Sequence, residues 1–309
     1  MRGLNALLAT LTTPMSTAMS APAIVAQRLR KGSCGSPRGA KRLVGDAVKQ
    51  ANRLLPDGAR VLVRMDSAFY GRNAVHAALT GGADVSVTVR MDKAVKAAIA
   101  TIGDDAWTTI EYPDAIFDET TGRWVSRAEV AEIPFTAFAA KAKREHVPGR
   151  LVVRRIPDLN ADKKKAAGQG TLFDIWRFHA FFTTAGQDVL DTVGADKTHR
   201  GHAIIEQVHA DLKNSALAHL PSGRFTANAA WLVLAVIAFN LTRAAASLTT
   251  PALAKATTGT IRRTLVTVPA RVATSARRVT LHLPEAWPWQ APWESLFDRV
   301  ADPPPAVTT

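Results

Sequence analysis

Two places in the sequence bring together residue types that could do chemistry, and the first is Asp66 in VRMDSAFYG. The run before it, RVLVRM at 60–65, has the length and apolar content of a buried strand. A carboxylate that follows such a strand lies at the edge of the sheet where open α/β folds bind their ligands. The same Asp could instead cap the helix that follows, and the sequence leaves both interpretations open.

The second place is the segment HRGHAIIEQVHADLK at 199–213. At about 100° per residue, one sector of a helix would hold its polar residues, namely His199, His202, Glu206 and Lys213. The aliphatic residues would form a stripe on the other side, suited to packing on a sheet. A merely solvated polar face is an alternative. So is a zinc site on the two His and Glu206, although no further ligand is evident.

Hydrophobic periodicity predicts the elements that would position these residues. Strands are expected at 4–13, 23–29, 60–65 and 84–91, and helices at 40–55, 73–79 and 92–102. Strands separated by single helices pair in parallel in part of their sheet. Alternating and β-branched segments then indicate a mainly β insertion, after which helices return from about residue 187.

The sequence therefore divides into four expected parts. They are the first part of an α/β core at 1–105, a mainly β insertion at 106–185, the Glu206 helix with a following core helix at 186–248, and a basic segment with a tail at 249–309. The most apolar run, AAWLVLAVIAF at 229–239, is too short to cross ~30 Å of hydrocarbon. We expect it to form a buried core helix.

The composition is that of a globular protein with a basic surface. Lys and Arg total 39 against 26 Asp and Glu, so the net charge is +13 over 309 residues. This favours a polyanionic partner, nucleic acid before an acidic membrane surface, although a generally basic composition is an alternative. Cys34 is the single cysteine, which excludes an internal disulfide and a cysteine zinc site and fits a reducing cytoplasm. The first residues make a poor signal peptide.

These observations together resemble a known family. The predicted order of strands and helices, with Asp66 after a strand and Glu206 on a later helix, resembles the RNase H-like core of DDE transposases. The segment at 199–213 keeps the spacing of the pattern Tyr-x2-Arg-x3-Glu-x6-Lys, with His199 and His202 at the Tyr and Arg positions. Blocks such as SVTVRMD, DAIFDETTGRWVSRAEVAEIPFTAF and LAHLPSGRFTANAAWLVLAVIAFNLTRAA resemble the insertion-sequence family numbered thirteen-eighty.

The resemblance implies a fold and a chemistry. The fold would be α/β: a mixed sheet with helices on both faces, interrupted by the mainly β insertion and followed by a helical C-terminal part. Asp66 and Glu206 would be the second and third of three acids that bind two Mg²⁺ or Mn²⁺ ions for hydrolysis and strand transfer on double-stranded DNA. Lys213, His199 and His202 would contact DNA, as would the neighbouring Arg200. A homodimer on paired DNA ends is also implied.

The first acid of the family has no match. It would lie on a strand before residue 4, and the two Asp residues before Asp66, Asp46 and Asp57, fall in a predicted helix and its closing turn. We therefore expect an N-terminally truncated transposase with little or no activity. A non-catalytic DNA-binding remnant and an RNase H-like nuclease with another substrate are the alternatives.

DNA binding would depend on dispersed basic residues. Four regions are candidates, each of which a solvated basic loop would also explain: Arg28–Arg42, Lys141–Arg144, Lys163–Lys165 and Arg262–Arg278. Trp124 could stack on an unpaired base, or it could pack in a hairpin.

Overall fold

The structure is a computed structural model that describes residues 3–14, 20–118, 123–157, 176–201 and 204–301. The chain forms two compact units: a first unit of residues 1–34 with 203–309, and a second unit of residues 35–202. The second unit is continuous in sequence, whereas the first is built from the two ends of the chain. The domain boundaries expected at 105, 185 and 248 stay predictions.

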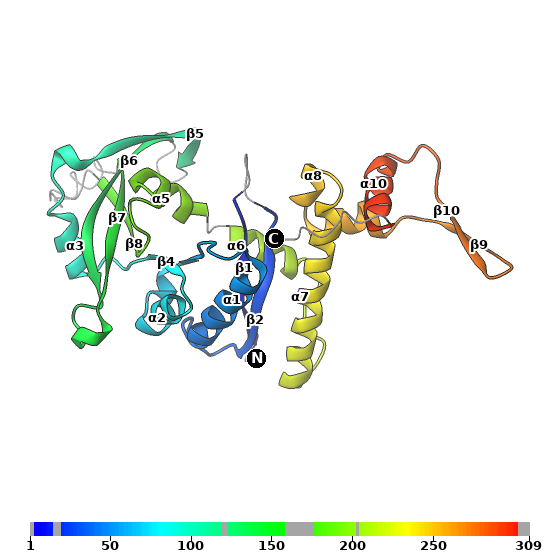
Figure 1. The fold of residues 1–309 in the computed structure, drawn as a ribbon, viewed down its shortest axis with the longest axis horizontal. Helices are drawn as coiled ribbons and strands as arrows, with labels where there is room; N and C mark the ends of the chain where they lie inside the picture. The colour runs from blue at the N-terminus through cyan, green and yellow to red at the C-terminus, as the bar shows by residue number, and fades with distance from the viewer. Residues whose placement is uncertain (1–2, 15–19, 119–122, 158–175, 202–203, 302–309) are drawn as a thin grey trace. The chain divides into compact units, whose positions relative to one another are not determined.

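The second unit is a six-stranded mixed sheet with its helices (Figure 1). Its helices are α1 (Ala40–Leu54), α2 (Arg72–Thr80), α3 (Lys93–Ile99) and α5 (Thr192–Arg200), with short 3₁₀ turns η1 (Ser67–Phe69), η2 (Asp104–Ala106) and η3 (Lys143–Glu145). Its strands are β3 (Leu62–Met65), β4 (Asp84–Thr88), β5 (Thr108–Asp118), β6 (Arg123–Ala137), β7 (Val147–Pro157) and β8 (Trp176–Thr183).

The sheet has the order β3-β4-β8-β7-β6-β5, in which β3 and β4 are parallel and all other neighbours are antiparallel. The insertion is mainly β, as predicted, and through β4 and β8 it extends the sheet that β3 begins. The register places Val87 beside Phe182 and Phe182 beside Leu151, so one apolar row crosses the centre of the sheet. This register decides which side chains of the three strands face the helices.

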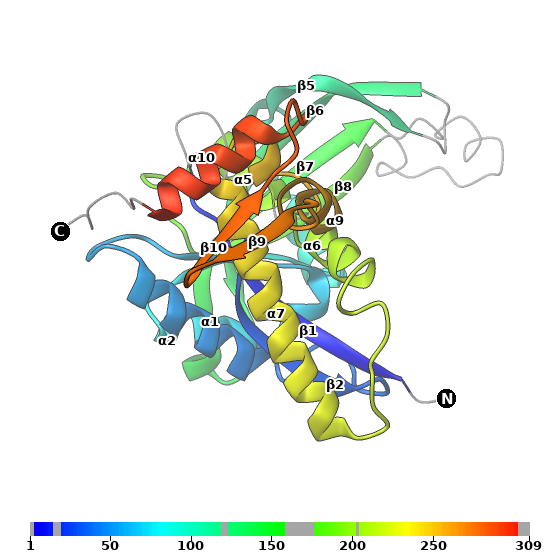
Figure 2. The same cartoon turned by 90° about the vertical axis from the view of Figure 1, so that its right-hand side faces the viewer.

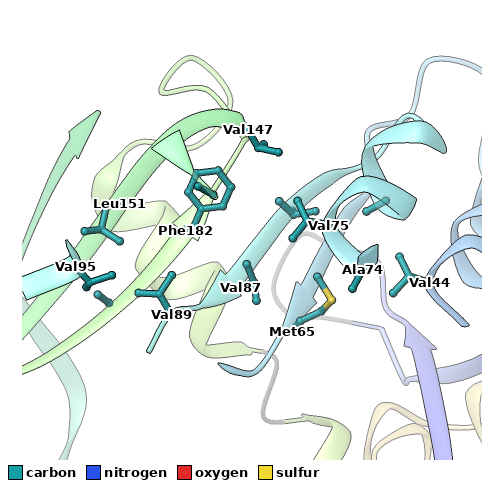
Figure 3. Packing of buried hydrophobic residues seen from close by; sticks show 14 of the residues in the cluster. Val44, Met65, Ala74, Val75, Val87, Val89, Val95, Val147, Leu151 and Phe182 are labelled. Carbon is teal, nitrogen blue, oxygen red and sulfur yellow. The ribbon is translucent and has the colours of Figure 1, made fainter. Parts of the chain in front are cut away.

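Helices cover both faces of the sheet. On one face, α1, α2 and α3 pack on the row of Val87, Phe182 and Leu151, and Figure 3 shows these side chains with Val75 of α2. On the other face Ala195 of α5 packs against β7 and β8. Alternate residues of a strand point to opposite faces, which is why neighbouring residues of β7 enter different cores. The predicted mixed α/β fold with helices on both faces is confirmed.

The first unit is a hairpin packed against helices. Its elements are β1 (Leu4–Leu11), β2 (Ala23–Lys31), α6 (Ile204–Lys213), α7 (Phe225–Ser247), α8 (Pro251–Ala254), α9 (Thr258–Ile261), the π-helical turn η5 (Arg262–Val266), β9 (Arg271–Ser275), β10 (Arg278–His282) and α10 (Gln290–Ala301). Its core joins Leu8 and Ile24 of the hairpin to α6 and α7. The Asn240 amide bonds both the N–H and the C=O of Ile24, at 2.9 and 2.8 Å, and so fixes α7 to β2.

The apolar run at 229–239, predicted to be a buried core helix, lies within α7 and is buried on one side of that helix. The helix α7 has 23 residues, and it is the described helix that is long and apolar enough to cross a membrane by length and composition alone. One side packs on β2 and α6 through Leu232, Val236 and Phe239. The other side exposes an apolar stripe that includes Leu234 and Leu241.

Candidate functional site

Asp66 follows β3 at the carboxyl end of the strand, as predicted, and its side chain is exposed. Its Oδ1 accepts a hydrogen bond from the Ala68 N–H at 2.9 Å, so the residue caps the short turn η1 that precedes α2. Capping uses one oxygen and leaves the carboxylate at the solvent boundary. Asp66 therefore fits both interpretations of the sequence, because it caps a turn and is also an exposed acid at the edge of the sheet.

An aromatic residue follows Asp66 closely in the sequence. Tyr70, four residues on, stacks on Phe138 with ring centroids 5.2 Å apart. Burial, and secondly the negative charge of Asp92, raise the pKa of Tyr70 to about 12. Tyr70 thus stays a neutral hydroxyl at physiological pH. Asp92, which sequence reasoning did not single out, follows β4 and caps α3 through Val95 N–H at 2.9 Å, so the two parallel strands each end near a capping carboxylate.

The structure describes two helices in the segment at 199–213, and residues 202–203 between them lie outside the described part, so the predicted continuous face stays a prediction. The helix α5 ends at Arg200, and α6 begins at Ile204 in the other unit. Arg64 of β3 binds the last turn of α5, since its Nη1 donates to the Thr198 carbonyl at 2.8 Å. A Cβ on Gly201 would lie 2.7 Å from the same nitrogen. Glycine, a poor helix former, permits this close approach.

His199 is buried, with only 6% of its surface exposed. Its Nδ1 lies 2.8 Å from Ser86 Oγ, its Nε2 lies 3.0 Å from Thr88 Oγ1, and its ring stacks on Phe181 at 4.1 Å. The imidazole therefore holds α5 to the sheet through both ring nitrogens. Its predicted contact with DNA stays a prediction, and that contact would require these hydrogen bonds to open. His202 lies outside the described residues.

Arg200, also predicted to contact DNA, is half-buried at the end of α5. Its Nε donates to Asp196 Oδ2 at 2.9 Å, and Asp196 is almost fully buried, with Arg154 Nη1 3.8 Å from its other oxygen. The Asp196 carboxylate is thus shared by two guanidinium groups. Trp124 lies in β6 opposite Phe117, and its side chain is outside the described part of the chain. The region Lys163–Lys165 is outside it as well.

Glu206 and Lys213 lie on α6 as the amphipathic pattern predicted. Both side chains are exposed, whereas Val208 and Leu212 of the same helix are buried in the core with β1, β2 and α7. Seven residues separate Glu206 from Lys213, which is about two turns or ~10 Å along one side of the helix. Glu206 is in the first turn, where the helix dipole favours an anionic side chain.

A buried carboxylate that sequence reasoning missed anchors α6. Asp211 accepts hydrogen bonds from the Thr258 N–H at 2.9 and 3.0 Å, from Thr258 Oγ1 at 2.6 Å, and from Arg243 Nη2 at 3.0 Å. Burial lowers the pKa of Arg243, and Asp211 opposes that shift. The signal was an Asp inside the apolar stripe, three residues after Val208. Asp211 thus ties α6 to α7 and α9 and fixes where Glu206 stands.

A basic groove runs between α1 and α2 in the second unit. It encloses about 690 Å³ and is lined by residues of both helices and of the turn η3: Lys41, Arg42, Gly45, Asp46, Arg72, Asn73, His76, Ala77, Thr80, Arg144 and Glu145. Arg72 pairs with Glu145 across the groove. Two of the basic regions predicted from the sequence, Arg28–Arg42 and Lys141–Arg144, therefore meet here.

The groove lies toward the same sheet edge as Asp66. Val48 of α1 lies against Gly81 at the end of α2, and Lys41 and Arg42 at the start of α1 share the groove with Arg72 at the start of α2. The two helices are thus parallel, and their first turns meet. Because α2 begins a few residues after Asp66, this end of the groove is the end nearest that carboxylate.

The mixed sheet, its two helical layers and the acid after β3 define a class, the RNase H-like DDE fold. The chain matches the sequence model of the family described as Transposase DDE domain group 1 over residues 20–304. The chain therefore belongs to this family of DDE transposases. Its general function is DNA transposition, a form of recombination, and the family acts on DNA and generally depends on divalent metals. A search of curated proteins found no match.

Proposed function

We propose that the chain is the transposase of an insertion sequence of the family numbered thirteen-eighty, and that Asp66 and Glu206 are two of its three catalytic carboxylates. The observation that carries this proposal is the placement of the two acids. Each is exposed at the end of an otherwise well-packed element, Asp66 after β3 and Glu206 in the first turn of α6. Within the described residues neither acid forms an ion pair.

The donor set suits Mg²⁺ or Mn²⁺, which prefer carboxylate oxygens together with water and phosphate oxygens. When bound, such ions activate a water or a 3′-hydroxyl and stabilise the leaving oxygen at phosphorus. Asp66 would hold them at the sheet edge while its Ala68 hydrogen bond fixes the carboxylate plane. Glu206 would be a second ligand to them, with its helix fixed by Asp211, and Lys213 would contact a phosphate of the DNA.

Iron-directed cleavage of the protein backbone tests whether the two acids share a metal. Fe²⁺ in place of Mg²⁺, with ascorbate and peroxide, is expected to cut the full chain near residue 66 and near residue 206. Asp66→Asn is expected to remove both cuts, because the ion is then held by one carboxylate. The matched control Asp298→Asn, another exposed acid, should leave both in place. Cuts at 206 that survive Asp66→Asn would refute a shared site.

We propose further that the 309-residue polypeptide by itself supplies only two of the three acids. The described residues contain no group of three or more His, Cys, Asp and Glu side chains that could hold a metal. Among the described strands, β3 pairs only with β4, and β1 only with β2. A further strand that carries an acid would fit beside β3, where it would lie next to Asp66.

The second candidate function is a non-catalytic DNA-binding protein. It is favoured by the net charge of +13, and such a protein could bind element ends or pair with an active protomer. The coding DNA just upstream of codon 1 separates the two. An in-frame strand that ends in Asp favours the transposase, and a stop codon or frameshift favours the DNA-binding protein.

The groove between α1 and α2 is our proposed site for the DNA backbone. Lys41→Ala and Arg42→Ala are each expected to weaken binding to duplex DNA and to lower the slope of log K against log salt by about 0.9, since each removes one phosphate contact. The measurement is fluorescence anisotropy at a series of salt concentrations. Lys49→Ala is the control, because Lys49 is exposed on the same helix outside the groove. An equal effect of Lys49→Ala would show that only net charge matters.

A further inference from the structure

The segment at 214–284 has a one-sided charge. It contains eight Lys and Arg residues and no Asp or Glu. Of these, Arg271, Arg277 and Arg278 fall within the hairpin β9–β10, and His282 ends it. Arg243 is buried and paired with Asp211, but the other cations of the segment have no acid near them in the sequence, and such a one-sided charge attracts a polyanion.

The hairpin is uncovered on both sides. All ten residues of its two strands are exposed, and Figure 1 shows the hairpin standing clear of α7, α8 and α10. An isolated two-stranded hairpin is marginally stable in water. Figure 2 views the hairpin from another side, with its strands lying flat as a ribbon. Such a ribbon is typical of a structure that is completed by a partner.

The register gives the ribbon two different faces. Arg278 pairs with Ser275, Thr280 with Ala273 and His282 with Arg271, so these six residues share one face. That face carries three cationic or titratable side chains separated by small ones. The other face carries Val272, Val279 and Leu281 with Thr274. The residues between the Arg side chains are small. The basic face can therefore approach a charged surface closely without steric hindrance.

The tip of the ribbon holds an arginine in an unusual conformation. Ala276 has φ 44° and Arg277 has φ 72°, both in the left-handed region. A two-residue hairpin turn with both residues left-handed usually uses Asn and Gly, because other side chains are strained there. A glycine in place of Arg277 would therefore make a more stable turn. Strain of this kind concentrates at functional sites.

We propose that the β9–β10 ribbon inserts into the major groove of duplex DNA with its basic face inward. The major groove, about 12 Å wide, admits a two-stranded β-ribbon, and strands lie about 4.8 Å apart. Arg277 at the tip and Arg271 and Arg278 along the face reach phosphates and base edges. This inference rests on the proposed function only in taking DNA as the partner, and it adds a contact separate from the groove at α1 and α2.

The test uses a pair of variants at the tip. Arg277→Gly removes the charge and relieves the turn, whereas Ala276→Gly relieves the turn and keeps the charge. We expect both full-length variants to melt no lower than the parent protein. Arg277→Gly is expected to weaken duplex binding roughly 5- to 10-fold near 0.1 M salt and to lower the salt slope by about 0.9. Ala276→Gly is expected to bind like the parent.

Further variants and a chemical probe locate the contact. Arg278→Ala should weaken DNA binding as much as Arg277→Gly does. Lys255 is an exposed cation outside the ribbon, so Lys255→Ala should weaken DNA binding by a smaller factor. Methylation of guanine N7, which lies in the major groove, should interfere with binding of the parent protein and interfere less with binding of Arg277→Gly. Val279→Thr, on the apolar face, should leave DNA affinity unchanged.

Four results would overturn the inference. They are equal affinities of Arg277→Gly and Ala276→Gly, no interference by N7 methylation, a loss with Val279→Thr as large as with Arg278→Ala, and tighter binding to poly-glutamate than to DNA, which would indicate an acidic protein partner. If the ribbon variants bind normally while Lys41→Ala binds weakly, only the ribbon contact is wrong. If the parent protein binds no DNA, both the ribbon contact and the proposed function are wrong.

Discussion

A plasmid that carries a cognate element end is expected to be cut by this polypeptide, in Mg²⁺, at least about 1,000-fold more slowly than by a family member with three catalytic acids. The physical reason is the number of carboxylate ligands that the chain offers to the metal ions. In our proposal Asp66 and Glu206 supply two carboxylates, and the described residues offer no group of three metal-binding side chains. Removing one member of a set that acts as a unit costs nearly as much as removing all of it.

Cleavage must be compared with DNA binding in the same preparation. Binding depends on dispersed Lys and Arg residues and is expected to persist, with a steep dependence on salt. The control is a version of the chain extended by an upstream strand that ends in Asp, which is expected to restore cleavage, and Glu206→Gln in that version should remove it again. Cutting by the 309-residue polypeptide at the rate of the three-acid relative would disprove our assignment of the acids.

Asp211→Ala is expected to destabilise the first unit by about 3–5 kcal/mol, the usual consequence of removing one partner of a buried ion pair. The side chains of Arg243 and Asp211 are 10% and 6% exposed, so water cannot replace the lost carboxylate. The Thr258 N–H and hydroxyl lose their acceptor at the same time. The melting temperature of the first unit should fall by roughly 10 °C, and amide hydrogens of α6 and α7 should exchange faster.

Two comparisons make this result specific to the buried pair. Asp188→Ala, an exposed acid in the second unit, should change stability by less than about 0.5 kcal/mol. The double change Asp211→Leu with Arg243→Met should recover much of the loss, since an apolar pair of similar volume leaves no buried charge. A normal melting temperature for Asp211→Ala would show that Arg243 finds another partner and that α6 does not depend on this carboxylate.

The elements around Asp66 were predictable because their signals are local. The helix at Ala40–Leu54 agrees with the prediction at 40–55 to one residue, the strand predicted at 60–65 ends at Met65, and the one predicted at 84–91 begins at Asp84 but ends at Thr88. The exposed face of α6 with Glu206 followed from spacing in the same way. Each of these depends on interactions within about a dozen residues, which one sequence displays directly.

The rest depended on contacts between distant residues. The last turn of α5 is bound by Arg64, which lies 134 residues before the Thr198 carbonyl that accepts its hydrogen bond. The burial of His199 required knowing that β4 lies under α5. The pairing of β4 with β8 crosses almost a hundred residues. The ribbon β9–β10 was missed because its turn uses Ala276 and Arg277 where a hairpin turn normally shows Asn or Gly.

The first unit is assembled from both ends of the chain, and this has a consequence during synthesis. The β1–β2 hairpin leaves the ribosome before its partners, because Asn240, which fixes Ile24, follows 216 residues later. At 5–20 residues per second the delay is roughly 10–40 s. The second unit, continuous in sequence, can fold in that interval. Until α6 and α7 emerge, the apolar side of the nascent hairpin is open to chaperones and to neighbouring nascent chains.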